Sequence, residues 1–281
     1  MSDPVSSIMT RNPIQHIVPS SISEIISLLI KNGITGIPLH DQNGKYVGMI
    51  SRKDIFKNFQ ETQLAMIMRR AESAKETDSI EEAARILLRQ GRRHMAVTDS
   101  EGRIAGVVTP QNFLPYIASH YGNMDISSFI SRVVIPIWDE TPLPLFFKIT
   151  QISEIYSFPV VNKNGDLTGI VTDRDIFEKV KVETTLIKTE SGMADDEDPW
   201  SWGGIRNVFS YMVRKGDINL PDIPVREISV KNPESVYENA KLSKVVEIML
   251  RGNYNQVPVL DPTGKLKSML FDMDLLGVFL A

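Results

Sequence analysis

The sequence contains no cysteine among its 281 residues. This absence excludes disulfides, thiolate-bound metals, iron–sulfur clusters and cysteine nucleophiles, and it agrees with a reducing compartment. Only four histidines occur, and no two have metal-ligand spacing. A Gly-x-Gly-x-x-Gly segment and a phosphate-loop lysine motif are also missing, so nucleotide hydrolysis by a known route is unsupported. We therefore expect no metal site and no catalytic residues.

Long apolar runs and an excess of one charge are missing as well. No apolar stretch approaches the ~18 residues of a membrane span, and the opening residues Met1 to Pro4 do not resemble a targeting leader. Lys and Arg number 31 against 35 Asp and Glu, a formal net charge of −4, so the whole-chain field does not favour nucleic acid. We expect a soluble cytoplasmic protein without a membrane partner.

One pattern recurs four times along the chain. From a marker residue, which is proline in three copies, a turn glycine always follows six residues later and an acid or amide sixteen residues later. These triplets are Pro38, Gly44 and Asp54; Ala96, Gly102 and Asn112; Pro159, Gly165 and Asp175; and Pro258, Gly264 and Asp274. The constant spacing indicates internal repeats.

Each repeat has the same local signals. A short strand precedes an amphipathic helix with apolar residues three and four apart, and two β-rich strands follow. Asp-x-x-Gly turns join these strands at Asp41, Asp99 and Asp261, and a second helix starts at the capping residue Ser51, Thr109 or Thr172. This predicts an α+β fold of four strand–helix–strand–strand–helix repeats, at 1–58, 59–122, 123–181 and 223–281. About 58 residues are too few for a full core, so repeats should pair into two modules. The insert at 182–222 is predicted to be an acidic loop leading into a helix.

These residues resemble the cystathionine β-synthase (CBS) domain family. The shared pattern is Pro-Val-apolar-Asp, x-x-Gly, apolar-Gly-apolar and Ser/Thr-x-x-Asp, and it covers nearly everything except the insert. Four copies in one chain resemble the γ subunits of AMP-activated protein kinase and stand-alone archaeal four-CBS proteins. The resemblance implies two CBS-pair (Bateman) modules, repeats one with two and three with four. It also implies clefts for AMP, ADP, ATP or S-adenosylmethionine as regulatory ligands, with no covalent cofactor.

The resemblance also implies roles for particular residues. The acid of Ser/Thr-x-x-Asp would hold a ribose diol, and basic residues two or three before the marker would reach phosphate. In the first module these residues are Ser51, Asp54, Arg93 and His94. A carboxylate suits a vicinal diol and a guanidinium suits phosphate. Capping of a helix start is the alternative interpretation of the Ser51 and Asp54 pair, and it requires no ligand.

The remaining positions form a less complete set of candidate ligand-binding residues. The second module offers Thr172, Asp175 and Asp274, with Arg132 and Arg174 as cationic partners. In the second repeat Asn112 replaces the acid, so its own ribose site should be empty or weak.

The sequence therefore favours a non-catalytic, energy-sensing regulatory protein that binds an adenine nucleotide and acts on a second copy of itself or on an unidentified regulated protein. Two alternatives are an interaction scaffold without ligand and a nucleic-acid binder. The latter would use Arg69-Arg70 and the face from Arg85 to Arg93, and the net charge argues against it.

Overall fold

The computed structural model describes residues 3–58, 61–130, 133–153, 155–172, 175 and 221–280. The predicted insert at 182–222 lies outside these residues except for its last two positions.

The first two repeats have the predicted order of helices and strands. Their elements are η1 (Val5–Ser7), β1 (Thr10–Arg11), β2 (His16–Ile17), α1 (Ile22–Lys31), β3 (Gly36–His40), β4 (Tyr46–Ser51), α2 (Arg52–Lys57), α3 (Leu64–Ile67), β5 (Ala74–Lys75), α4 (Ile80–Gln90), β6 (Met95–Thr98), β7 (Ile104–Val108) and α5 (Pro110–Tyr121).

The fourth repeat follows the same order, and so does the third as far as the structure describes it, up to β10. Their described elements are η2 (Ile126–Phe129), β8 (Ile137–Trp138), α6 (Leu143–Ser153), β9 (Ser157–Val161), β10 (Leu167–Thr172), η3 (Val225–Glu227), β11 (Val230–Lys231), β12 (Val236–Tyr237), α9 (Leu242–Gly252), β13 (Gln256–Leu260), β14 (Leu266–Phe271), α10 (Asp272–Leu275) and η4 (Leu276–Leu280).

Strand exchange joins the repeats in pairs. In each repeat the short strand runs parallel to the next long strand, which pairs antiparallel with its hairpin partner, as in β2-β3-β4. The edge strand β1 of the first repeat adds to the second repeat's sheet, giving the order β1-β7-β6-β5. Likewise β11 of the fourth repeat adds to the third repeat's sheet, giving β11-β10-β9-β8. The predicted pairing of repeats one with two and three with four is confirmed.

The four predicted turns are formed. In each, one side-chain oxygen accepts hydrogen bonds from two backbone N–H groups, and glycine takes a positive φ between 75° and 83°, a conformation open to a residue without Cβ. The residue pairs are Asp41 and Gly44, Asp99 and Gly102, Asn162 and Gly165, and Asp261 and Gly264. These turns fix the register of each hairpin, and the second strand of each hairpin leads to Asp54, Asn112, Asp175 or Asp274.

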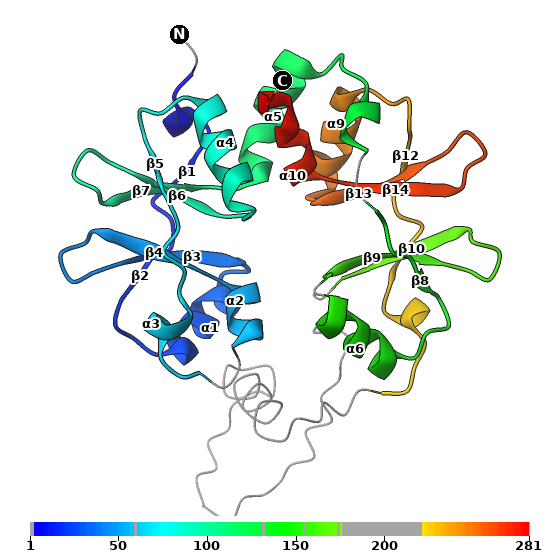
Figure 1. Ribbon diagram of the computed structural model, residues 1–281, viewed down its shortest axis with the longest axis horizontal. Helices are drawn as coiled ribbons and strands as arrows, with labels where there is room; N and C mark the ends of the chain where they lie inside the picture. The colour runs from blue at the N-terminus through cyan, green and yellow to red at the C-terminus, as the bar shows by residue number, and fades with distance from the viewer. Residues whose placement is uncertain are drawn as a thin grey trace, which may run out of the picture. The chain divides into compact units, whose positions relative to one another are not determined.

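The chain divides into two compact units. The first comprises Met1–Asp125, Lys241–Asn255 and Phe271–Ala281, and the second comprises Ile126–Ala240 and Gln256–Leu270. Within the first unit the sheets of repeats one and two contact each other, with a backbone hydrogen bond from Tyr46 to Gly102 at the hairpin tips. Helices α1 to α3 lie outside one sheet, and α4 and α5 lie outside the other (Figure 1). The helices and sheets thus form four layers.

The helices of the fourth repeat pack within the first unit, which the sequence did not predict. Helix α9 buries its apolar face against α5, and α10 and η4 contact α4 and α5 (Figure 1). Phe279 meets Phe113 edge-on, with ring centroids 6.1 Å apart, and both side chains are buried. Because the outward faces of α5 and α9 are apolar, packing them together removes both from water.

Candidate functional site

The start of helix α2 holds Asp54 in a fixed position. Ser51 ends β4 with extended backbone (φ −125°, ψ 163°) and caps the helix. One carboxylate oxygen of Asp54, Oδ2, accepts from the Ser51 N–H at 3.1 Å and from the Ser51 hydroxyl at 2.6 Å. The predicted capping box is therefore present, and the Asp54 side chain is 5% exposed.

Two arginines of the second repeat approach the other oxygen of this carboxylate. Arg69 Nε donates to Asp54 Oδ1 at 3.0 Å, and Arg92 Nη1 lies 3.7 Å from the same atom. Their side chains are 47% and 31% exposed, so each guanidinium presents a face to solvent. Among the described residues, neither guanidinium makes another ion pair or hydrogen bond. The cluster of Asp54, Arg69 and Arg92 therefore has guanidinium N–H donors that no described residue uses.

The backbone of Arg69 is anchored to the first repeat. Its N–H and C=O exchange hydrogen bonds with Met49 at 2.8 Å each. A side chain at residue 48 would collide with the Arg69 carbonyl oxygen, so Gly48 permits this approach. Arg69 is the second repeat's copy of Arg11, 58 residues earlier, and that periodicity is the signal that could have identified it from the sequence.

His94 lies at the contact between the two repeats, but as a neutral group. Its Nε2 is 2.7 Å from the Thr35 hydroxyl, and its ring covers Gly36, where a Cβ would lie only 2.8 Å from the ring. Burial, with a further contribution from the positive charge of Arg93, lowers the pKa of His94 to about 4. At neutral pH His94 therefore contributes a hydrogen bond and packing rather than positive charge.

Arg93 contacts a carboxylate that the sequence did not connect with it. Its Nη1 and Nη2 donate to the two oxygens of Asp272 at 2.6 Å each, across 179 residues of sequence. Asp272 is completely buried. Burial raises the pKa of the Asp272 carboxyl, and the ion pair with Arg93 opposes that rise. Arg93 as a phosphate contact for a nucleotide held by Ser51 and Asp54 stays a prediction; among the described residues, the arginines that pair with Asp54 are Arg69 and Arg92.

The second repeat uses Asn112 to hold the repeats together. Its Oδ1 accepts from the Thr109 N–H at 2.8 Å, and its Nδ2 donates to the Ile8 carbonyl at 2.9 Å. An aspartate could not make the second bond, because an ionised carboxylate only accepts. Asn112 thus has a structural role, and an empty or weak ribose site in this repeat stays a prediction.

The corresponding acids of the third and fourth repeats also accept hydrogen bonds from the residue three positions earlier. Asp175 Oδ2 accepts from the N–H and hydroxyl of Thr172, both at 2.7 Å. Asp274 Oδ2 accepts from the Phe271 N–H at 2.9 Å. Arg132 and Arg174 lie outside the described residues. Asp175 and Asp274 as ligand-binding residues stay predictions.

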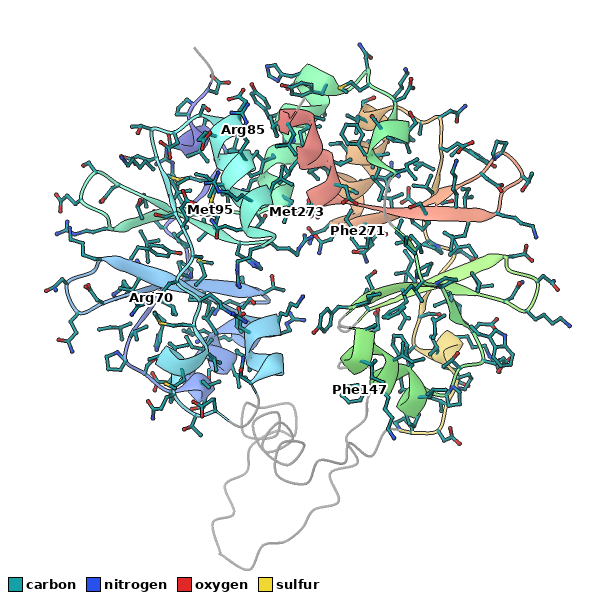
Figure 2. All side chains as sticks on the ribbon, in the orientation of Figure 1. Arg70, Arg85, Met95, Phe147, Phe271 and Met273 are labelled. Carbon is teal, nitrogen blue, oxygen red and sulfur yellow. The ribbon has the colours of Figure 1, made fainter. Side chains whose placement is uncertain are left out.

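The basic face proposed for nucleic acid is largely paired. Arg85 Nε donates to the carbonyl of Phe279 at 3.2 Å, and Figure 2 labels Arg85 on its helix. Arg89 pairs with Glu72 at 3.0 Å. These contacts reduce the positive charge available to a polyanion.

Within the described part of the chain, no helix combines the length and apolar character that a membrane crossing requires. A family model described as the CBS domain matches residues 5–61, 64–119, 126–182 and 225–281.

Relatives and solved structures agree with this match. The uncharacterized protein MJ1225 of Methanocaldococcus jannaschii is 23% identical over 197 residues, 63% of this chain and 70% of that protein. Its crystal structure, presented as a proposed archaeal homologue of γ-AMPK, aligns over 99% of this chain and 100% of its own, with a TM-score of 0.74 and 19% identity. An uncharacterized conserved protein of Pyrococcus horikoshii covers 99% and 100%, with a TM-score of 0.69 and 24% identity. The four matched segments correspond to the four structural repeats, and the chain belongs to the CBS-domain family.

Proposed function

We propose that this chain is a non-catalytic regulatory protein that binds an adenine nucleotide, AMP, ADP or ATP, at the cluster of Asp54, Arg69 and Arg92. The main support is a buried carboxylate approached by two partly exposed guanidinium groups. Some N–H donors of these groups have no partner among the described residues. A carboxylate suits a ribose diol and guanidinium suits phosphate. One nucleotide contains both groups.

The charge of the cluster favours phosphate over the other ligand that the family resemblance offers. S-adenosylmethionine carries a positive sulfonium, and two arginines beside a single carboxylate repel it. A nucleotide phosphate would instead gain charge-assisted hydrogen bonds.

Arg93 and His94 keep proposed roles that fit their contacts. Asp272 takes two of the five N–H donors of Arg93 and compensates its charge, so Arg93, whose side chain is 38% exposed, would offer a phosphate only its remaining donors. His94, neutral at pH 7, would offer a hydrogen bond beside Thr35 rather than a charge. We therefore assign the principal phosphate contacts to Arg69 and Arg92.

A ligand at this cluster would link two repeats. Asp54 and Ser51 belong to the first repeat, and Arg69 and Arg92 to the second, so one molecule would contact both. Such binding produces a signal only if the ligand has different affinities for two arrangements of the repeats. Different affinities for AMP and ATP would make the protein an energy sensor. The recipient would be a second copy of this chain or a separate regulated protein.

Calorimetric titration with AMP, ADP, ATP and S-adenosylmethionine tests the proposal. We expect saturable binding of at least one nucleotide and weaker binding of S-adenosylmethionine. Arg69→Gln and Arg92→Gln should each weaken nucleotide binding by about tenfold, the equivalent of one charge-assisted hydrogen bond. Asp54→Asn should weaken binding of the nucleoside adenosine as well.

Arg103→Gln is the matched control, because Arg103 pairs with Glu101 on an exposed turn of the same unit. Its nucleotide affinity should equal that of the wild-type protein. Undiminished binding by all three cluster variants, or tighter binding of S-adenosylmethionine than of every nucleotide, would overturn the assignment.

A further inference from the structure

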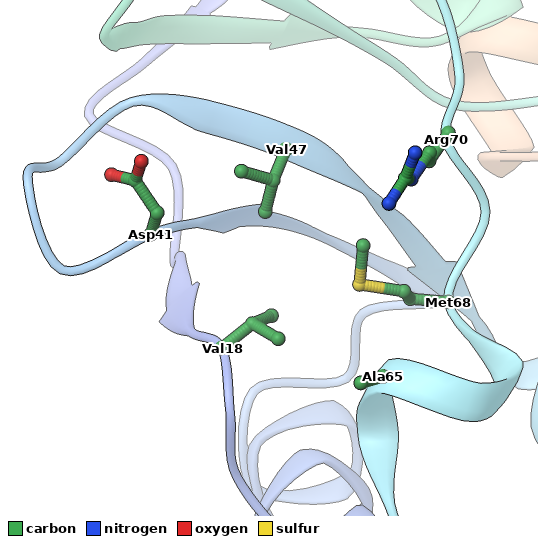
Figure 3. Close-up of a pocket in the computed structure, with 6 residues that line it drawn as sticks. All are labelled: Val18, Asp41, Val47, Ala65, Met68 and Arg70. Atoms are coloured by element: carbon green, nitrogen blue, oxygen red, sulfur yellow. The ribbon is translucent and has the colours of Figure 1, made fainter.

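A second concave site lies between the sheet of the first repeat and the segment that opens the second repeat. The cavity measures about 400 Å³, and we call it the valine pocket (Figure 3). It is lined by Val18, Asp41, Val47, Ala65, Met68 and Arg70.

The valine pocket is separate from the Asp54 cluster. The segment that follows α3 is extended, with φ −60° and ψ 151° at Met68. Successive side chains of an extended segment point to opposite sides. Accordingly Arg69 turns to Asp54, whereas Met68 and Arg70 line the pocket.

The four repeats provide an internal comparison at the first valine. Each residue at this position directly follows the short parallel strand and donates its backbone N–H to the neighbouring strand. The residues are Val18, Glu76, Asp139 and Glu238. Three repeats place a carboxylate here, and the first repeat alone places an apolar side chain.

The second valine shows the same contrast. The matching positions after the strand irregularity are Val47, Ala105, Thr168 and Lys267. In the fourth repeat Lys267 Nζ forms an ion pair with Glu238, beside a smaller hollow of about 250 Å³. Where the fourth repeat holds an ion pair, the first repeat has two half-buried valines beside a larger cavity.

The rim of the valine pocket carries charge. Arg70 is exposed and has no ion-pair or hydrogen-bond partner among the residues that the structure describes. Figure 3 shows Asp41 at the other end of the pocket. Asp41 Oδ1 already accepts two backbone N–H groups of its turn, at 2.8 and 2.9 Å. Arg70 is therefore the charged group with donors free for a ligand.

We propose that the valine pocket binds a small apolar carboxylate, with its hydrocarbon body against Val18, Val47 and Met68 and its carboxylate on Arg70. Apolar walls with one oriented polar group are typical of small-molecule sites, whose volumes run from about 300 to 1,000 Å³. A planar guanidinium forms paired hydrogen bonds with a carboxylate. The proposal is independent of nucleotide binding at Asp54.

Methyl NMR titration of the full chain with hydrocinnamate tests this inference. We expect saturable shifts of the methyl signals of Val18, Val47 and Met68. The neutral amide hydrocinnamide, of nearly the same shape, should bind about tenfold more weakly, and Arg70→Gln should bring hydrocinnamate to the affinity of the amide.

The double variant Val18→Glu with Val47→Lys reproduces the residues of the fourth repeat and should abolish the shift of the remaining Met68 methyl signal. Arg70 is exposed, so Arg70→Gln keeps the test decisive even if the double variant fails to fold. Equal affinities for acid and amide, or no saturable shift, would overturn the proposal. Shifts of the same methyl groups by AMP that survive Asp54→Asn would also overturn it, since the pocket would then be a nucleotide site.

Discussion

Asp54 and Asp272 are two buried carboxylates of the first unit that both face arginine, yet their surroundings differ. Asp54 is shared by two arginines at 3.0 and 3.7 Å. Asp272 is held by one arginine through two parallel bonds of 2.6 Å. The adjacent residues Arg92 and Arg93 supply one cation to each. The same residue types therefore form a cluster with spare donors in one place and a closed clamp between repeats two and four in the other.

The largest expected effect comes from breaking the clamp. Asp272→Asn removes the charge that compensates Arg93 inside a contact of the second and fourth repeats. We expect a loss of about 3 kcal/mol in the free energy of unfolding, the lower end of the range for one partner removed from a buried ion pair, because Asp272 is buried whereas Arg93 is 38% exposed. Chemical denaturation followed by circular dichroism measures it.

The control for this prediction is Glu101→Gln, which breaks an exposed pair with Arg103. It should cost less than about 1 kcal/mol. Equal losses for the two variants would show that Asp272 and Arg93 contribute no more than a surface pair.

Protonation of His94 at low pH is expected to have a smaller effect on the free energy of unfolding. Its pKa of about 4 lies below the value near 6.5 of an unfolded chain. Between these pH values the unfolded state binds more protons, so stability falls as pH is lowered through this window, by up to about 3 kcal/mol. The groups around the ring are Thr35, Arg93, Asp54 and Arg52.

Denaturation of the wild-type protein and of His94→Gln between pH 7 and about 4 isolates this contribution. The difference in stability between the two proteins should change with pH, and the variant should show the flatter profile. A constant difference across the window would mean that His94 keeps an ordinary pKa.

The smallest effect is expected at Asn112, which occupies the second repeat's copy of the Asp54 position. Asn112→Asp loses the hydrogen bond to the Ile8 carbonyl and should reduce stability by about 1–2 kcal/mol. Despite the restored acid, we expect no additional nucleotide site. Gln42→Glu, on an exposed turn, is the charge-matched control. A second calorimetric binding event in Asn112→Asp would contradict this prediction.

The repeat architecture was accessible from the sequence because its signals are local. The sixteen-residue interval from Pro38 to Asp54 contains a strand, a glycine turn and a helix cap, and each is fixed by its own few residues. The same reasoning located the Asp54 capping box, since hydroxyl and acid lie three residues apart.

The partners of the arginines were not accessible in this way. Arg93 and Asp272 are separated by 179 residues, and no spacing rule connects them. Their contact follows from the packing of α9, α10 and η4 against α4 and α5, which depends on the fit of apolar faces. Arg69 could be predicted only in part. The sequence shows its periodic relation to Arg11, but its approach to Asp54 depends on the close contact of its backbone with Gly48.

The exchanged strands β1 and β11 bear on what can be divided or duplicated in this molecule. A fragment that ends after the first repeat would contain β1 without its partner β7. The backbone N–H and C=O groups of β1 would then be unpaired and could form hydrogen bonds with another chain. The smallest part that keeps its sheets complete, in a truncation or in a gene duplication, is therefore a pair of repeats rather than one.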